Sequence, residues 1–190
     1  MARTDEMAKQ FKGSVIGKLG TEAEKDIFNG KDLPKDPTKR AQWVKDALIR
    51  LDKTTDKKIT SEIMRDNGVN CANHNIGVVK NALKRRSKHT SLENFIDAEI
   101  KKPTKGTSLK RENNALILSY LPKNFSHPMR CFCALVNSLP SNEVLPNTYC
   151  SCSVGFVETW WSQVVGVPVN VQLLESAITG SDKCHFRITW

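Results

Sequence analysis

The distribution of charge divides the chain into two regions of different character. Residues 1–112 contain 25 Lys and Arg and 16 Asp and Glu, so they carry the whole net charge of +9 of the 190-residue chain. Residues 113–190 contain four basic and four acidic residues and five of the six cysteines. The Lys-, Thr-, Gly- and Ser-rich stretch 103–112 is predicted to be a loop between them. We therefore expect a basic helical region, 1–112, and a smaller module, 113–190, packed together as one globular unit.

Apolar periodicity predicts helices in the first region. Pro37 suits a first helical turn, and the apolar residues after it recur at three- and four-residue spacing. Further helices are expected over about 56–67, ending at Gly68, over 73–86, and from Ser91 onward.

The second region alternates between apolar and polar residues in a way that is typical of strands. Strands are predicted over 115–121, 129–137, 167–175 and 184–190, with a helix over 151–165 between the second and the third. The predicted fold class is therefore α+β: a helical N-terminal region followed by a β-β-α-β-β antiparallel module.

Strand alternation also predicts a metal site. Glu175 shares a predicted strand face with a row of apolar residues, and Cys184 begins the apolar row of the last strand. A carboxylate that points inward is costly unless it is paired or bound to a cation. Cys150 and Cys152 stand at the start of the predicted helix, where the helix dipole favours thiolates. The prediction is a Zn²⁺ site built from Cys150, Cys152, Glu175 and Cys184, against the alternative that these cysteines are ordinary buried apolar residues.

Three more cysteines form a second possible thiol cluster. Cys131 and Cys133 share one face of a predicted strand and could complete a four-cysteine site with the pair near residue 150, or simply pack in the interior. Cys71 could face the C-terminal site as a ligand, a nucleophile or a pocket wall, or be a buried residue at a helix start. Phe156 and Trp160 are candidate pocket residues, with ordinary core packing as the alternative.

Several segments of the second region resemble the 4-vinyl-reductase-type domain. That superfamily includes the sensor domains of phenol-responsive bacterial regulators and is related to TRAPP trafficking subunits. The resemblance is closer still to a group of uncharacterised bacterial proteins with a Cys-x-Cys-x-x-Gly segment, and it covers about residues 115–190. The segments that carry it are Tyr149-Cys-Ser-Cys-Ser-Val-Gly155, Gly166-Val-Pro-Val169-Asn-Val171, Leu173-Leu-Glu175-Ser and Gly180-Ser-Asp182-Lys-Cys184-His-Phe186-Arg-Ile188.

The resemblance implies a small-molecule pocket enclosed by a sheet and helices. In the phenol-sensor branch it also implies a structural zinc held by one Cys, one Glu and two further Cys. Cys152, Glu175 and Cys184 match the first, second and last of these, whereas Ile178 stands where another cysteine would follow the glutamate. Cys150 or Cys71 would have to complete the shell, or one coordination position would stay open, as in catalytic zinc sites.

The first functional hypothesis is a small-molecule-binding, sensor-like cytoplasmic protein with a Cys/Glu zinc site. One alternative is a zinc- or thiol-dependent hydrolase, although no catalytic residues can be named. A second is nucleic-acid binding through the basic runs 84–88 and 101–105, which we consider unlikely because acidic residues are interleaved nearby. No apolar stretch suits a membrane span and the N-terminus lacks a signal-peptide pattern, so a cytoplasmic protein is expected. Whether it forms a homodimer stays open.

Overall fold

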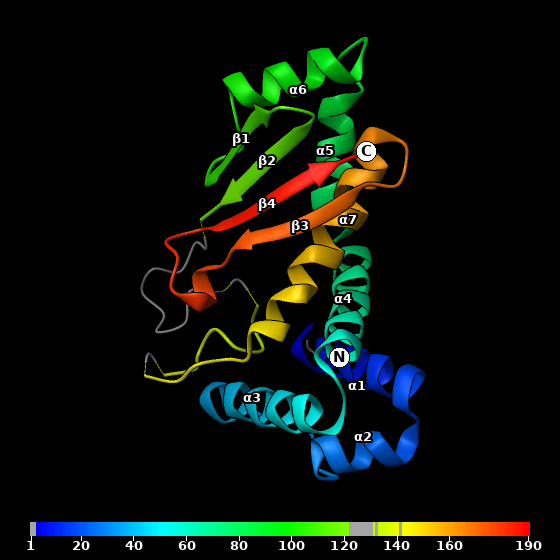
Figure 1. Ribbon diagram of the computed structural model, residues 1–190, viewed down its shortest axis with the longest axis vertical. Coiled ribbons are helices and arrows are strands. Elements are labelled where there is room, and N and C mark those ends of the chain that lie inside the picture. Colours follow the sequence, from blue (N-terminus) through cyan, green and yellow to red (C-terminus); the bar gives the residue numbers. More distant parts are fainter. Residues whose placement is uncertain (1–2, 122–130, 132, 141) are drawn as a thin grey trace.

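The computed structural model describes residues 3–121, 131, 133–140 and 142–190 and confirms the α+β class. The helices are α1 (Arg3–Leu19), α2 (Thr21–Phe28), α3 (Pro37–Thr54), α4 (Lys57–His74), α5 (Ile76–Arg86), α6 (Leu92–Lys101) and α7 (Ser151–Val165). The strands are β1 (Thr107–Glu112), β2 (Ala115–Tyr120), β3 (Asn170–Glu175) and β4 (Cys184–Thr189), and two short 3₁₀ helices are η1 (Asn147–Cys150) and η2 (Ala177–Thr179). In Figure 1, α1, α2 and α3 lie at one end and the sheet at the other, with α4 and α7 between them.

Local capping explains where several helices begin. The side chain of Asp36 accepts a hydrogen bond from the Lys39 N–H at 2.8 Å, directly before Pro37, and Asp56 does the same for α4. Ser91 caps α6. Each cap satisfies one of the backbone donors that the first helical turn leaves without a partner.

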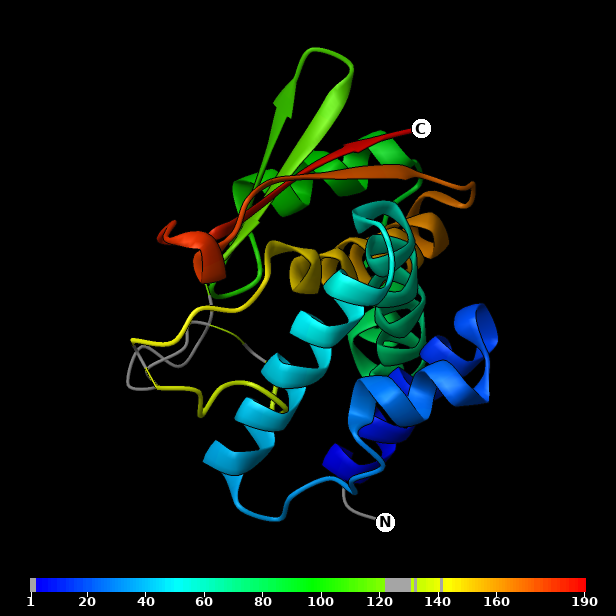
Figure 2. The same cartoon turned by 60° about the horizontal axis from the view of Figure 1, so that its bottom comes forward.

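Gly68 does not end a helix, as the sequence had predicted, because α4 continues to His74. A Cβ atom at Gly68 would collide with the backbone carbonyl of Cys152, and one at Gly155 would collide with that of Arg65. The two glycines therefore let α4 and α7 cross backbone against backbone, which no other residue would allow. The two helices lie side by side in Figure 2.

The sheet is antiparallel with the order β1-β2-β4-β3. The stretch predicted as a loop contains β1, which forms a hairpin with β2 through Asn113 at φ 53°. The described part of the predicted strand 129–137 forms turns instead, and Met129, Arg130 and Phe132 lie outside the described residues. The strand predicted over 115–121 is confirmed as β2, and the β-β-α-β-β order is kept because β1, which precedes it, is a strand that the sequence analysis took for a loop.

Two apolar clusters meet at α7. One joins α1–α4 to the segment 135–149, and the other joins α5, α6 and α7 to the inner face of the sheet. Figure 2 shows these last three helices on one side of the sheet. None of the helices in the described ranges is long and apolar enough to cross a membrane. The position where the two clusters meet is where the cysteines gather.

Candidate functional site

Glu175 does not point into the apolar interior. The register of β3 shifts between Leu173 and Glu175, so Glu175 pairs with His185 rather than with Cys184. Its side chain is 54 % exposed, accepts a hydrogen bond from the Ser181 hydroxyl at 2.9 Å and lies 3.4 Å from His185 Nδ1. The predicted inward carboxylate is therefore wrong, because a β-bulge turns the end of the strand over.

Cys150 and Cys184 meet at the buried Ser176. The Cys150 sulfur lies 2.9 Å from the Ser176 hydroxyl oxygen. Cys184, at the start of β4, accepts a hydrogen bond from the Ala177 N–H at 3.5 Å, and the hydroxyls of Ser176 and Tyr120 also bond to it. Both thiols are buried, so the structure brings together two of the predicted cysteines without the glutamate.

The other cysteines lie around this pair, and all six form what we term the thiol cluster. Burial raises the pKa of the Cys152 thiol well above its usual value, and nearby sulfurs raise it further. Those sulfurs belong to Cys133, Cys131, Cys150 and Cys71. Cys131 is likewise influenced by Cys133, Cys150 and Cys184. The thiol cluster joins α4, the segment after β2, η1, α7 and β4, and its members are Cys71, Cys131, Cys133, Cys150, Cys152 and Cys184.

Two tyrosines border the thiol cluster. Burial raises the pKa of Tyr120 and of Tyr149 well above the usual value, with further contributions from neighbouring cysteines. Tyr120 shares a hydrogen bond with Ser153, and Tyr149 shares one with Cys133. Their hydroxyls therefore stay protonated and extend the network of weak donors around the sulfurs.

The thiols are held in the neutral form. Burial raises the pKa of Cys150 to about 11, partly offset by its bond to Ser176, and raises the pKa of Cys184 as well. In the part of the chain that the structure describes, no cation lowers these values, and no three or more His, Cys, Asp or Glu side chains are placed to hold a metal ion. The predicted zinc site is therefore wrong, because its carboxylate lies in solvent and the described side chains form no group of ligands that could hold the ion.

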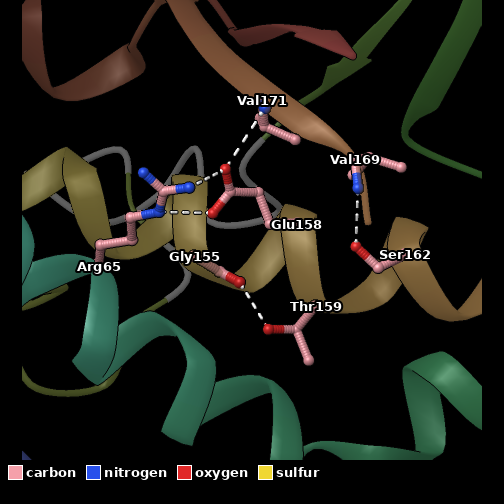
Figure 3. Close-up of polar contacts among 7 residues, drawn as sticks. All are labelled: Arg65, Gly155, Glu158, Thr159, Ser162, Val169 and Val171. Atoms are coloured by element: carbon pink, nitrogen blue, oxygen red, sulfur yellow. Dashed lines mark hydrogen bonds and ion pairs between the residues drawn. The ribbon is translucent and has the colours of Figure 1, made fainter. Parts of the chain in front are cut away.

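The sequence missed one polar group that ties the two regions together. Glu158 of α7 is buried, and Arg65 of α4 donates to both of its oxygens, with Nε 2.6 Å from Oε2 (Figure 3). The N–H of Val171 also donates to Glu158, at 3.4 Å, and that of Val169 to the Ser162 hydroxyl at 3.1 Å. Because β3 is an edge strand, these bonds satisfy N–H groups that have no neighbouring strand. Glu158 is the only charged residue of α7, and this was the available signal.

The candidate pocket residues are only partly buried. Trp160 borders a cavity of about 20 Å³ together with Trp161 and Thr107. That volume holds about one water molecule. Figure 3 shows the neighbouring turn of α7, where the Thr159 hydroxyl donates to the Gly155 carbonyl at 2.8 Å. Phe156 is not among the residues that border this cavity. A ligand pocket formed by Phe156 and Trp160 stays a prediction.

Comparison with solved structures finds a shared fold with H-NOX proteins. An H-NOX protein from S. oneidensis in the Fe(II) state, a triple mutant, aligns with a TM-score of 0.51 and 12% identity over 96% of this chain and 93% of that one. An Fe(II) unliganded H-NOX mutant from K. algicida aligns with a TM-score of 0.51 and 11% identity over 98% of this chain and 95% of that one. A further S. oneidensis structure, in the Fe(II)NO state, aligns with a TM-score of 0.48 and 12% identity over 96% of each chain. At these identities the likeness shows the fold alone.

Heme is named for a further structural neighbour, which aligns with a TM-score of 0.47. Two features of the described residues count against heme in this chain. The backbones of α4 and α7 are in direct contact at Gly68 and Gly155, which leaves no room for a porphyrin between these two helices. His74 is exposed and bonded to Gln10 at 2.9 Å, His89 lies against Phe95, and His185 adjoins Glu175.

The comparisons also correct the resemblance drawn from the sequence. The two structures with a TM-score of 0.51 are H-NOX proteins, and neither supports a 4-vinyl-reductase-type domain. No curated protein matches this chain. A sequence model described as "Family of unknown function (DUF6144)" matches residues 5–190, almost the whole length. The chain therefore belongs to the DUF6144 family.

Proposed function

We propose that this chain is a small-molecule sensor domain whose stimulus acts on the thiol cluster. The observation that carries the proposal is the convergence of six cysteines from five separate segments at the position where the two apolar clusters meet. The fold shared with H-NOX proteins, over nearly all of both chains, is consistent with a sensory role. The described residues do not suit heme, so the responsive groups are sought among the protein's own side chains.

The chemistry available to neutral neighbouring thiols is oxidation to a disulfide. Cys133 and Cys152 both pack against the first apolar cluster, and the Cys133 sulfur contributes to the raised pKa of Cys152, so we propose these two as the pair. A peroxide would be the oxidant: both S–H bonds break, one S–S bond forms, and the two electrons and two protons convert the peroxide to two water molecules. The raised pKa values slow this reaction at neutral pH, because the thiolate is the attacking form.

A bond at Cys152 would act directly on the contact between the two regions. Cys152 lies in the first turn of α7, and its backbone carbonyl is the group that lies against Gly68 of α4. One and a half turns later, Glu158 connects α7 to Arg65 and to β3. Tying the first turn of α7 to the segment that carries Cys133 would therefore alter the packing of both α4 and the edge strand.

The test is oxidation of the full chain with hydrogen peroxide, followed by peptide mapping without reduction and by hydrogen exchange. We expect a Cys133–Cys152 disulfide and altered exchange in α4, α7 and β3. Cys133→Ser should abolish the exchange change, whereas Cys71→Ser is the matched control that should retain it. Oxidation that leaves exchange in these elements unchanged, or that occurs only after unfolding, would overturn the proposal.

The two alternative functions find less support. A thiol-dependent hydrolase needs an activated thiolate, and burial raises the pKa values of Cys150 and Cys152 instead. For nucleic-acid binding, Arg85 in the first basic run is bound to Glu99 at 2.8 and 3.0 Å, and Arg86 donates to the His89 carbonyl. These contacts reduce the number of basic groups that are open to phosphates.

A further inference from the structure

A second candidate site lies in the N-terminal helical layer, apart from the thiol cluster. The loop between α2 and α3, at the bottom of Figure 1, and one face of α3 enclose an open cavity of about 260 Å³. We call it the α3 pocket. The lining residues that matter for its chemistry are Lys31, Pro34, Lys39, Trp43, Asp46 and Arg50.

Contacts from two helices hold the wall of the α3 pocket in place. Lys12 of α1 donates to the Lys31 carbonyl at 3.2 Å, and Arg40 of α3 donates to the Lys35 carbonyl at 2.8 Å. Asn29 begins the loop with φ 58°. The loop is therefore fixed by side chains from outside it, so little conformational entropy would be lost when a ligand enters.

The charge of the lining favours an anion. Three cationic side chains line the pocket against one carboxylate, Asp46, which already accepts a hydrogen bond from Gln42 at 2.8 Å. Within the described ranges, neither the Lys31 nor the Lys39 ammonium group has an acidic partner. Two free ammonium groups beside one cavity match a carboxylate or a phosphate.

Trp43 supplies part of the apolar wall of the α3 pocket. Its side chain is only 6 % exposed, because the ring stacks on Phe28 with centroids 4.9 Å apart and the Lys12 ammonium group lies 5.8 Å from the ring centroid. Its indole Nε1 is buried, so a ligand in the pocket would contact the exposed part of the ring and not this donor.

We propose that the α3 pocket binds a small carboxylate with a flat apolar body, such as an aromatic acid. The carboxylate would lie between Lys31 and Lys39, and the ring would lie against Pro34 and the edge of Trp43. At about 260 Å³ the cavity is smaller than the usual ligand site of about 300–1,000 Å³, which limits the ligand to a small molecule. This site does not depend on the function proposed for the thiol cluster.

The test uses benzoate as the probe and the indole N–H signals of the full chain in ¹H–¹⁵N spectra. Trp43→Phe identifies the signal of Trp43 among the four tryptophans. We expect saturable shifts of that signal with a Kd of about 1 mM or lower. Benzyl alcohol, which lacks the charge, should bind about tenfold more weakly or worse, and inorganic phosphate tests whether charge alone suffices.

Variants separate this pocket from general attraction to a basic protein. Lys31→Gln with Lys39→Gln should weaken benzoate binding at least about tenfold, whereas Lys35→Gln, in the same loop but outside the lining, should not. The proposal would be overturned if benzyl alcohol or inorganic phosphate bound as tightly as benzoate. It would also be overturned if the double variant bound benzoate with an unchanged Kd. The absence of any shift of the Trp43 signal at about 10 mM benzoate, a concentration well above the expected Kd, would overturn it as well.

Discussion

At the scale of single residues, Gly68 is the position least able to change. We expect Gly68→Ala to lower the free energy of unfolding by at least about 2 kcal/mol, because its Cβ would meet the backbone of Cys152, which cannot rotate away. Gly13→Ala is the control: Gly13 lies in α1 with open space around it, so alanine should stabilise the helix by about 0.5–1 kcal/mol. Urea denaturation measures both, and a neutral Gly68→Ala would contradict the close crossing.

Cys150 should make the protein less stable at alkaline pH. In the unfolded chain its thiol ionises near its usual pKa of 9.0, whereas in the folded protein burial raises the pKa to about 11. Between these values only the unfolded state loses the proton, so stability falls as the pH rises from 9 to 11. The full effect, reached above pH 11, is about 3 kcal/mol.

The measurement is the urea midpoint at pH 8 and at pH 10.5. Cys150→Ser, whose hydroxyl does not titrate in this range, should lose less stability than the unchanged chain over the same interval. Equal losses in the two proteins would show that Cys150 ionises as easily in the folded state as in the unfolded one.

The sequence predicted the position of a residue correctly only where regular spacing along a helix or strand determines it. Strand alternation and a helix start predicted Cys150, Cys152 and Cys184 as ligands of one metal ion. The structure places Cys150 and Cys184 on either side of Ser176, with Cys152 nearby, but not as such a site. The prediction that Glu175 points inward was wrong, because it assumed strict alternation of side chains along the strand. A single β-bulge before Glu175 moves its side chain to the opposite face of the sheet. Gly68 was taken as a helix end because a glycine at a helix terminus and one at a helix crossing look the same in sequence.

At the scale of elements, the ion pair between Arg65 and Glu158 joins α4, α7 and β3. Arg65→Met leaves a buried carboxylate with only the Val171 N–H as a partner, so it should cost about 1–3 kcal/mol. Adding Glu158→Gln should recover part of that loss, giving a coupling energy of similar size. The exposed pair Glu22 and Lys25 is the control, with a coupling of about 0.5 kcal/mol or less.

Composition explains why β1 was taken for a loop and why a strand was predicted over 129–137, whose described residues form turns. β1 is rich in Lys, Arg and Glu because it is an edge strand with few buried side chains, so it resembles a loop in composition. The apolar residues of 133–139 lie in a series of turns and pack into the first apolar cluster. A short apolar run in the sequence does not show whether it forms a buried strand or buried turns. The helices α3 and α6, with clear caps and periodicity, matched their predictions closely.

At the scale of the whole molecule, the contact of α4 with α7 should make the chain unfold in one step. The two apolar clusters meet at these helices, so neither should remain folded once the crossing opens. Intrinsic tryptophan fluorescence follows both clusters, through Trp43 in one and Trp161 in the other. Its transition in urea should coincide with that seen by far-UV circular dichroism. Separate transitions would show that the clusters are independent.

The fold shared with H-NOX proteins and the direct contact between α4 and α7 lead to opposite predictions for heme. If the fold alone determined the cofactor, purified protein mixed with hemin would show a saturable Soret band at one heme per chain. We expect no such saturation, because α4 and α7 are in contact at Gly68 and Gly155 and the described histidines lie elsewhere. The H-NOX protein from S. oneidensis, treated in parallel, is the positive control. Stoichiometric, saturable binding by this chain would mean that the crossing opens to admit the porphyrin, and the thiol cluster would then have to be considered beside heme rather than in its place.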